Sequence, residues 1–437
     1  MVMTPWGDSD SLRDRRLRPG PGKTREEVEQ NQRERLYGAM IALVAEKGYE
    51  ATTLADLAEL SGVSSRTFYG LFESKQACFA QTLQNMIMLA VGMATQIGSD
   101  TQLSGWEEQS RAGSRAFAEM VVAQPAAARA CLIEAFAAGP EAVAPLEAAI
   151  AGFEALAKMI IAQVPERAAM PGEILAAYIG AVEEIVRMRL LSEEQDTLPD
   201  LMDQLWDLIS SYVPPPEPLR LAERVPVTAA ESLDAHDNAE RAIRAFAVEA
   251  AERGYTATTV ADILARAQMS ATTFYDQFGG KEDAMLAAID SAGAHIGAAM
   301  RPAMRRAPDW PAAVRAAIGG VFNFLASRPA LARLVLVDAY VAGPEALKRR
   351  VGFLLPLEAL LAEGREQAKD APPEITEELM NGVFFSLSRR TISQDGPQAL
   401  PALAPLCTYL ALAPYLGPEE ACEVANAYVG RRRDAAG

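Results

Sequence analysis

Histidine and cysteine are scarce in this 437-residue sequence, which holds two histidines and four cysteines. The histidines, His236 and His295, lie in unrelated surroundings. The cysteines are scattered and form no Cys-x-x-Cys pair: Cys78, Cys131, Cys407 and Cys422. These counts leave almost no material for a Cys-His or Ser-His-Asp centre and argue against a structural zinc site. We therefore expect no enzymatic activity, no metal and no cofactor.

Long apolar runs and aromatic residues are also lacking. No run reaches the roughly 18 apolar residues of a membrane span, and the first residues do not resemble a signal peptide. With few cysteines, this favours a reducing cytoplasm. Aromatic residues make up only 7% of a chain that is 50% hydrophobic and rich in alanine, which favours helices over a β-sandwich. We expect an all-α protein.

Basic residues are outnumbered, since 41 lysines and arginines face 58 acidic residues and the net charge is −17. Such a charge repels nucleic acid on average, although a local basic patch can overcome that average. Residues 13–25 form one such patch in a Pro-Gly context, and this flexible arm could reach DNA phosphates or a minor groove through Arg13, Arg15, Arg16 and Arg18. The alternative is a solvated tail that only aids solubility.

The sequence repeats itself at a spacing of about 200 residues. KGYEATTLAD at residues 47–56 matches RGYTATTVAD at residues 253–262, and Lys75 matches Lys281 at the same offset of 206 residues. Downstream, residues 125–142 match 329–346 at an offset of 204. A period this long indicates a duplicated module rather than a solenoid. The joint falls in a proline-rich stretch that favours an extended spacer.

Each copy opens with signals for three short helices. Gly48 and Gly254 are typical helix stops, and Thr53 and Thr259 each begin a capping box. Residues 61–64 form a tight turn, and a third helix is expected over residues 65–72. Helix, tight turn and helix make a helix-turn-helix, whose second helix enters the DNA major groove.

The sequence from Arg33 to Leu83 resembles the DNA-binding domain of the tetracycline-repressor (TetR) family, and residues 239–289 resemble it again. The residues that carry the resemblance in the first copy are Gly48-Tyr49, Ala51-Thr52-Thr53, Ala55-Asp56, Gly62-Val63-Ser64, Thr67-Phe68-Tyr69, Phe72 and Ser74-Lys75. The second copy departs at Gln268, Gly280 and Asp276. The resemblance implies two helical protomers, each with a C-terminal regulatory domain, that form a pseudo-dimer within one chain.

The expected organisation has six parts: a basic arm (1–25), a first helix-turn-helix domain (26–84), a first regulatory and dimerisation domain (85–213), a Pro-rich linker (214–236), a second helix-turn-helix domain (237–289) and a second regulatory and dimerisation domain (290–437). Helices near 173–191 and 197–212, with 374–390 and 400–416, are candidates for the family's dimer interface. The alternative is that these helices form ordinary intradomain cores.

Small hydroxyls, an arginine and a tyrosine face outward on each predicted reading helix and suit base edges and phosphates. The candidate DNA contacts are Thr52, Thr53, Ser64, Ser65, Arg66, Thr67, Tyr69 and Lys75, with Thr258, Thr259, Ser270, Ala271, Thr272, Thr273, Tyr275 and Lys281. Arg66 is the strongest candidate for a base contact. Because Arg66 becomes Thr272 and Ser65 becomes Ala271, we expect an operator with unlike halves.

The family's regulatory domain often encloses a small hydrophobic effector. Candidate pocket residues are Phe117, Met120, Phe136, Phe153, Tyr178, Phe322, Tyr340, Phe353 and Phe385, although most of them could be plain core. We expect an effector-responsive regulator, most simply a repressor, that binds double-stranded operator DNA. It would be self-contained in one chain or would pair further. In the alternative, only the first helix-turn-helix binds DNA, and the second copy is a dimerisation partner without effector response.

Overall fold

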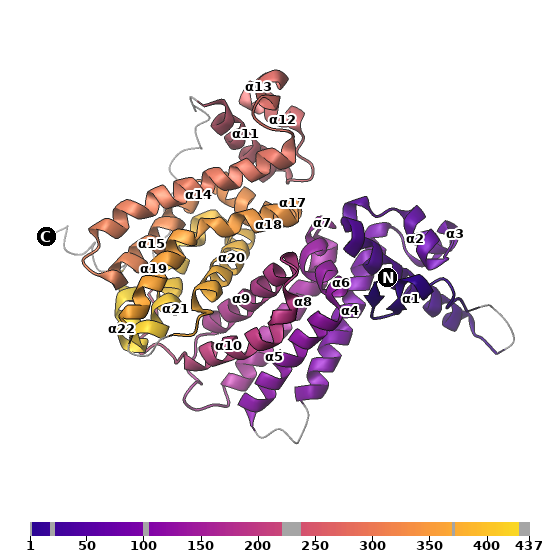
Figure 1. Ribbon diagram of the computed structural model, residues 1–437, viewed down its shortest axis with the longest axis horizontal. Coiled ribbons are helices and arrows are strands. Elements are labelled where there is room, and N and C mark those ends of the chain that lie inside the picture. Colours follow the sequence, from indigo (N-terminus) through magenta and orange to yellow (C-terminus); the bar gives the residue numbers. More distant parts are fainter. Residues whose placement is uncertain (1, 18–21, 99–104, 221–236, 369–371, 428–437) are drawn as a thin grey trace. The chain divides into compact units, whose positions relative to one another are not determined.

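The computed structural model describes residues 2–17, 22–98, 105–220, 237–368 and 372–427 (Figure 1). These residues are overwhelmingly helical; the strands among them are β1 (Met3–Thr4) and β2 (Gly7–Asp8), two residues each. The expectation of an all-α protein is confirmed. The chain divides into two compact units, Met1–Ala155 with Val186–Asp203 and Leu156–Ile185 with Gln204–Gly437.

The first unit opens with three helices that we call the first head: α1 (Arg25–Ala51), α2 (Leu54–Ser61) and α3 (Ser65–Leu71). After the head come α4 (Lys75–Gly98), α5 (Trp106–Ala123), α6 (Pro125–Arg129), the π-helical segment η2 (Ala130–Glu134), α7 (Ala135–Ala137) and most of α8 (Pro140–Ile161). A capping box of Thr24 and Glu27 starts α1. Gly48, at φ 82°, kinks that helix one turn before its end.

The N-terminal segment is folded rather than a flexible arm, which corrects that expectation. β1 pairs with β2, and η1 (Ser9–Ser11) follows. Leu12 is fully buried and the Trp6 ring lies 5.1 Å from that of Tyr37 in α1, so apolar contacts hold the segment on the first head. Arg15 donates to the Trp6 carbonyl. Arg13, Arg15 and Arg16 belong to this folded segment, whereas Arg18 lies outside the described residues.

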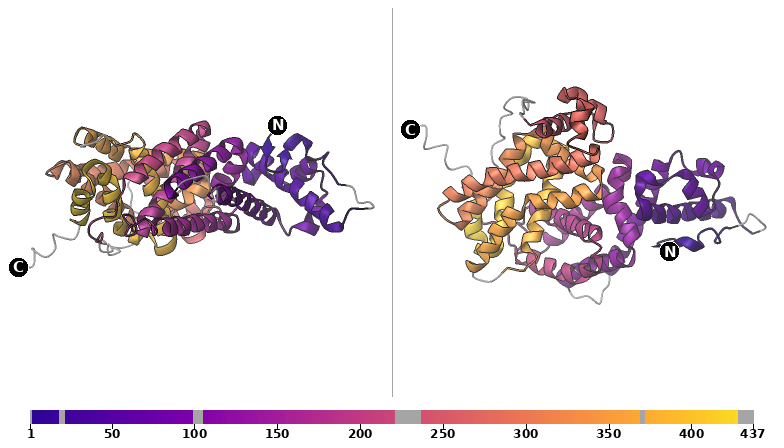
Figure 2. Two further views of the ribbon diagram at one scale, coloured as in Figure 1. Left: turned by 90° about the horizontal axis from the view of Figure 1, so that it is seen from below. Right: turned by 45° about the horizontal axis from the view of Figure 1, so that its top comes forward.

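The second unit repeats this order, with the second head formed by α11 (Asn238–Arg253), α12 (Val260–Ala267) and α13 (Ala271–Tyr275). The elements that follow are α14 (Lys281–Arg306), α15 (Trp310–Ala326), α16 (Pro329–Arg333), the π-helical η4 (Leu334–Asp338), α17 (Ala339–Ala342), α18 (Pro344–Arg350), η5 (Val351–Phe353), α19 (Leu355–Glu363), η6 (Gly364–Glu366), α20 (Thr376–Asp395), η7 (Pro397–Leu403), α21 (Ala404–Leu416) and α22 (Pro418–Asn426). The long α14 lies against α15, as the two views of Figure 2 also show.

The duplication extends to local irregularities. Both copies contain a five-residue π-helical turn, and the two turns stand at the 204-residue offset of the downstream repeat. Such turns are rare and insert an extra residue into a helix. Their recurrence shows that the copies share a fold well beyond their heads.

Part of the first copy belongs to the second unit. The helices α9 (Gly172–Leu191) and α10 (Leu198–Ser211), separated by η3 (Gln195–Thr197), each contribute residues to it. There α9 crosses α20 closely: a Cβ added at Gly382 would lie 2.8 Å from the carbonyl oxygen of Ala181. We call this crossing the α9–α20 seam. Tyr212 and Tyr409 donate hydrogen bonds across the same two copies, to the carbonyls of Leu410 at 2.6 Å and Val213 at 2.8 Å.

Only the start of the predicted linker is described. Residues 217–220 lie against α22, where Arg220 donates its amide to the Asn426 side chain at 2.7 Å and Cys422 and Asn426 donate to the carbonyls of Glu217 and Pro218. Residues 221–236 lie outside the described residues.

One continuous helical segment, Pro397–Leu416, is long and apolar enough to cross a membrane by length and composition. The expectation that no such run exists therefore needs correction. However, 67% of its apolar window is buried inside the protein, and Tyr409 within it is fully buried. Its apolarity is explained by its place in the helical core. Two sharply bent helix pairs in the described residues, Trp106–Ala123 with Pro125–Ala137 and Trp310–Ala326 with Pro329–Ala342, pass the same test only when each pair is joined.

Candidate nucleic-acid interface

The first head is built around a short turn between two capped helices. Thr53 caps α2 and exchanges hydrogen bonds with Asp56, and Gly62 ends α2 in the left-handed region at φ 64°. Ser64 then caps α3 by accepting from the Thr67 amide. Buried apolar side chains hold the three helices together: Leu57, Val63, Phe68 and Phe72. The predicted helix-turn-helix is confirmed as a structure.

One face of α3 is left open to solvent. Ser65 and Arg66 are exposed, and Tyr69 is 59% exposed although it is a large apolar residue. Thr67 is half-buried, and its hydroxyl is hydrogen-bonded to that of Ser64 at 2.9 Å. A guanidinium, a phenol and small hydroxyls at the start of an exposed helix are groups that contact base edges and phosphates.

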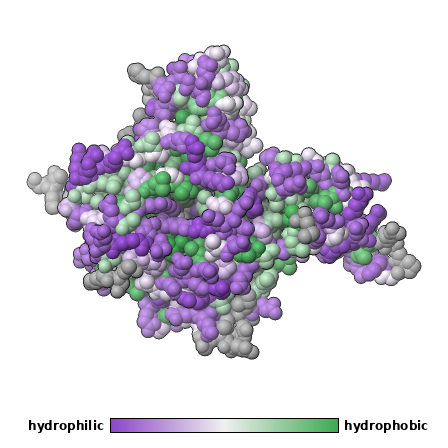
Figure 3. Space-filling model, viewed as in Figure 1, coloured by the Kyte–Doolittle hydropathy of each residue, from purple (hydrophilic) through white to green (hydrophobic). Residues whose placement is uncertain are grey.

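The second head presents the same pattern. Ser270 caps α13, and its hydroxyl lies 2.8 Å from that of Thr273. Ala271, Thr272 and Tyr275 are exposed, the last at 57%. In Figure 3, hydrophilic residues cover most of the visible surface of the second head, at the top of the view. The two heads therefore offer matching faces with different side chains.

Thr52 and Thr258 do not lie on these faces. Each side chain is 1% exposed, and each hydroxyl donates to the carbonyl of the glycine four residues earlier, Gly48 at 2.8 Å or Gly254 at 2.9 Å. These threonines hold the chain between the first and second helices of each head. Their predicted direct contact with DNA is corrected, whereas Thr53 and Thr259 remain exposed at the helix starts.

Lys75 and Lys281 are already engaged by the protein. The Lys75 ammonium donates to the carbonyls of Tyr49 and Thr52, both at 2.9 Å, and lies 4.1 Å from the Tyr49 ring centre. Burial lowers the pKa of Lys75. Lys281 similarly donates to the Tyr255 carbonyl at 3.1 Å. Both lysines thus bind the chain where the first helix of each head ends, and a phosphate would have to compete with these carbonyls.

The capping carboxylates in both heads are held in their charged form. The hydrogen bond from Lys47 at 2.5 Å, with those from Thr53, holds the pKa of Asp56 well below its usual range. Hydrogen bonds from Thr259, followed by Arg253 at 2.6 Å, lower the pKa of Asp262 in the same way. The start of the second helix is therefore fixed similarly in each head.

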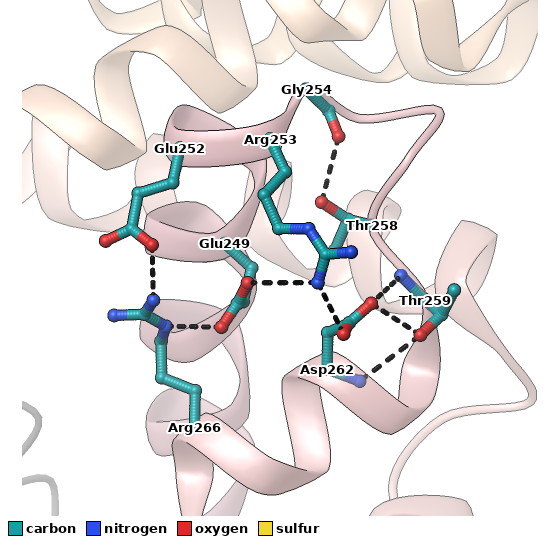
Figure 4. A network of polar contacts seen from close by, with 8 residues as sticks. All are labelled: Glu249, Glu252, Arg253, Gly254, Thr258, Thr259, Asp262 and Arg266. Carbon is teal, nitrogen blue, oxygen red and sulfur yellow. Dashed lines mark hydrogen bonds and ion pairs between the residues drawn. The ribbon is translucent and has the colours of Figure 1, made fainter.

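The second head adds a network of ion pairs that is shown in Figure 4. Arg266 on α12 contacts two carboxylates of α11, Glu249 at 2.6 Å and Glu252 at 2.5 Å. Arg253 lies 4.0 Å from Glu249 and so joins the two groups of contacts. These pairs fasten α12 to α11.

The predicted effector-pocket residues lie in different surroundings in the two copies. Tyr340, Phe353 and Phe385 are buried near one another in the second copy, and the Phe353 and Phe385 ring centres are 6.3 Å apart. Phe322 lines a separate apolar hollow with Ile318, Val321, Leu354, Leu357, Met380, Phe384 and Cys407. That hollow has a volume of about 10 Å³, enough for one water molecule. In the first copy Phe136 is buried, whereas Phe117, Met120 and Tyr178 are half-buried and Phe153 is 36% exposed.

The sequence analysis missed two acidic groups, Glu134, which is half-buried, and Glu184, which is buried. Glu134, at the end of η2, accepts a hydrogen bond from the Tyr49 amide of the first head at 2.9 Å. Glu184 on α9 pairs with Arg350. The signal for the second was available, because Glu183 and Glu184 interrupt an otherwise apolar predicted interface helix.

The comparisons with known proteins agree with this geometry. The family model described as bacterial regulatory proteins of the tetR family matches twice, at residues 38–82 and 243–288. Each match begins inside the first helix of a head and covers the rest of that head and the start of the helix after it.

The chain is a tandem duplicate of a TetR-family regulator.

Two solved structures are similar to parts of this TetR-family chain. One is the fatty acid degradation regulator FadR from Bacillus halodurans, at 21% identity and a TM-score of 0.37, covering 41% of this chain and 96% of that one. The other is the TetR family transcriptional regulator PfmR from Thermus thermophilus, at 23% identity and a TM-score of 0.31, covering 43% of this chain and 94% of that one. Among curated proteins, no relative matches. TetR-family regulators bind DNA and are not enzymes. Within the described residues, no three His, Cys, Asp or Glu side chains form a group that could hold a metal ion.

Proposed function

We propose that this TetR-family protein is a cytoplasmic transcriptional repressor that pairs its two copies within one chain and binds an operator with two unlike half-sites. The observation that carries the proposal is the matched exposure of two faces whose chemistry differs. Arg66 and Ser65 on α3 stand where Thr272 and Ala271 stand on α13, and all four are exposed. An arginine reads guanine through two hydrogen bonds, and a threonine has no such bidentate donor.

Pairing within one chain is supported by the α9–α20 seam and the two tyrosine hydrogen bonds beside it. These contacts join residues of the first copy to residues of the second. Because the linker keeps the copies at high effective concentration, pairing needs no second chain. Light scattering should then give a mass near 46.9 kDa. A stable mass of twice that value would instead indicate four heads.

The proposed DNA contacts are those that remain exposed or at helix starts: Thr53, Ser64, Ser65, Arg66, Thr67 and Tyr69, with Thr259, Ser270, Ala271, Thr272, Thr273 and Tyr275. Arg13, Arg15 and Arg16 would assist from the folded N-terminal segment, where Arg13 lies beside the turn at Gly62. From this position these arginines would contact backbone phosphates near the first head rather than a more distant minor groove.

Selection of bound sequences from a random DNA pool, using the full chain, tests the proposal. We expect two half-sites one helical turn apart and different in sequence. Enrichment of a perfect palindrome would refute the unlike halves. A footprint covering one half-site would favour the second candidate, in which only the first head binds.

That second candidate has its own support. Asp276 ends α13, which spans five residues against seven in α3, and adds a negative charge beside the proposed reading face. Tyr69→Ala and Tyr275→Ala separate the two cases in the same footprint. If both heads bind, each substitution weakens one half of the protected region, whereas Tyr275→Ala has no effect if only the first head binds.

We further propose that a small hydrophobic effector acts on the second copy, through the hollow lined by Phe322 and Phe384. Its present size means that binding would have to part the helices that line it, and such a shift could change the separation of the heads. A thermal-shift screen against apolar small molecules tests this. A stabilising compound should lose its effect in Phe322→Ala if it binds there, whereas an unchanged shift would place it elsewhere.

A further inference from the structure

A charged cluster lies buried in the second unit, between α9 of the first copy and α17, α18 and α20 of the second. Glu184 is 3% exposed, Arg350 is fully buried and Tyr340 is 1% exposed. The Arg350 guanidinium pairs with one carboxylate oxygen of Glu184, and the Tyr340 hydroxyl donates to the other at 3.0 Å. Three side chains from two copies therefore form one polar contact, which we call the Glu184 triad.

Burying the charges of the triad costs free energy, because the surroundings satisfy Arg350 only in part. Two nitrogens of Arg350, Nε and Nη1, are buried without a hydrogen-bond partner. Burial, with the nearby charge of Arg389, lowers the pKa of Arg350 well below its usual range. The ring centres of Tyr340 and Phe385 lie 4.2 Å and 4.3 Å from its guanidinium carbon, and these cation–π contacts offset part of the cost. A buried ion pair of this kind often stabilises the fold no more than apolar residues of similar volume would. Removing one partner, however, strongly destabilises the fold, because the other charge stays buried.

The duplication shows what stands at the matching positions. At the 204-residue offset Tyr340 corresponds to Phe136 and Arg350 to Leu146. At the 202-residue offset of the interface helices, Gly382 corresponds to Gly180 and Ser386 to Glu184. The glycines that permit the close crossing are thus present in both copies, whereas the triad has its carboxylate only in the first copy and its partners only in the second.

We propose that the Glu184 triad determines which copies pair, by making the first copy pair with a second copy and excluding pairs of like copies. Two first copies would bury Glu184 near the phenylalanine and leucine at positions 136 and 146, where Leu146 supplies no guanidinium in place of Arg350 and the nearest arginine is Arg187, 5.5 Å from the Phe136 ring centre. Two second copies would bury Arg350 opposite Ser386, which carries no charge. Each like pair therefore leaves a buried charge without the partner it has in the mixed pair, at a large free-energy cost.

Such selectivity matters for a chain that carries two similar interfaces. Without it, the copies of different chains would join first to first and second to second, and chains would be linked into larger assemblies. The proposal rests on the pairing of copies proposed above and is independent of DNA binding. DNA selection and the experiments below can therefore fail separately.

The first experiment uses the full chain with a protease site inserted between residues 221 and 236. The cut protein is unfolded, refolded and analysed by native mass spectrometry, which separates mixed pairs from like pairs by mass. We expect mixed pairs alone from the wild-type sequence. A levelled variant gives each triad position the residue of its counterpart: Glu184→Ser, Tyr340→Phe and Arg350→Leu. It should give mixed and like pairs in the proportions of random pairing.

The matched control is Tyr415→Phe, which removes a buried hydroxyl that bonds Glu377 within the second copy at 3.2 Å. It should leave mixed pairs alone. Like pairs from the wild-type sequence, or mixed pairs alone from the levelled variant, would overturn the proposal.

The second measurement uses the intact chain and does not depend on refolding. Arg350→Leu alone removes the positive charge that pairs with Glu184 and should lower the melting temperature by several degrees, whereas the levelled variant should recover most of that loss. A contact that only stabilises the fold would not recover when all three residues are replaced. Recovery would therefore support a role of the triad in selecting which copies pair. A levelled variant as unstable as Arg350→Leu, or an Arg350→Leu variant as stable as wild type, would contradict the proposal.

Discussion

The two heads have the same three helices, but apolar contacts hold the helices together in the first head and ion pairs do so in the second. In the first head, Leu43 and Leu60 occupy α1 and α2, and the folded N-terminal segment packs Leu12 and Trp6 against α1. At the 206-residue offset, the same two positions in the second head are Glu249 and Arg266, an ion pair at 2.6 Å (Figure 4).

The turn is fastened differently as well. Arg35, buried in α1, donates to the Ser61 carbonyl at 2.6 Å, and Gly62 follows in the left-handed region. The second head has Arg241, Ala267 and Gln268 there, and Gln268 adopts the left-handed region at φ 48° without a glycine's freedom. The outward faces of α3 and α13 still share one exposure pattern. A head's reading surface can thus be kept while its internal support is rebuilt.

We expect the largest difference between the two copies in how their stability depends on pH, and we place its origin where each regulatory domain contacts its head. Glu134 in the first copy bonds the Tyr49 amide, whereas the matching Asp338 is one methylene shorter and has a buried oxygen, Oδ2, without a partner. Burial raises the pKa of Asp338 to about 7, although Arg333 opposes the shift. The unfolded chain releases this proton near pH 4. Stability should therefore fall as pH rises from about 4 to about 7 and then level off.

Asp338→Asn removes this titration. By the relation of about 1.4 kcal/mol per pKa unit, the variant should gain up to about 4 kcal/mol over wild type at pH 8 and almost nothing at pH 4. Urea unfolding across this pH range measures the gain. Glu134→Gln in the first copy is the comparison: burial raises the pKa of Glu134 as well, but the Tyr49 amide and Arg129 oppose the shift, so the gain at pH 8 should be smaller than that of Asp338→Asn. A gain for Asp338→Asn that does not change with pH would exclude the titration as its cause.

The next effect concerns reading itself. Arg66→Ala should cost about 1–3 kcal/mol in operator affinity and remove the preference for one base in one half-site. Thr272→Ala, at the matching place in α13, should cost less and alter only the other half-site. Binding measured against operators with single-base changes in each half tests the assignment. Equal losses of preference in both halves from Arg66→Ala would show that the heads do not read separate half-sites.

The sequence predicts the heads well because their signals are local. The boundaries of α2 and α3 follow from Thr53, Gly62 and Ser64, each of which acts within a few residues of its own position. The burial of Thr52, the engagement of Lys75 and the docking of Leu12 depend instead on partners more distant in space or along the chain. The Glu184 triad is the extreme case, since Glu184 meets partners 156 and 166 residues away. Periodicity predicts an interface helix there but not which charge it faces.

A smaller difference lies in the turn of each head. A non-glycine residue in the left-handed region costs roughly 1 kcal/mol, so Gln268→Gly should stabilise the second head by about 0.5–1 kcal/mol. Ala265→Gly, at an exposed position inside α12, should destabilise it by a similar amount. Hydrogen exchange of the α12 and α13 amides reports the second head alone. Faster exchange in Gln268→Gly would mean that the glutamine side chain contributes more than its backbone strain costs.

We expect the smallest change in stability when the ion pair of the second head is replaced by the leucines of the first. Arg266→Leu alone leaves Glu249 nearly buried with only the distant Arg253, and should cost about 1 kcal/mol. Adding Glu249→Leu gives the second head the leucine pair of the first and should return stability to within about 0.5 kcal/mol of wild type. The double variant should also lose the salt dependence of unfolding that ion pairs confer. If it stays as unstable as Arg266→Leu, the second head needs its ion pairs for reasons of shape, and the two ways of fastening a head are not interchangeable.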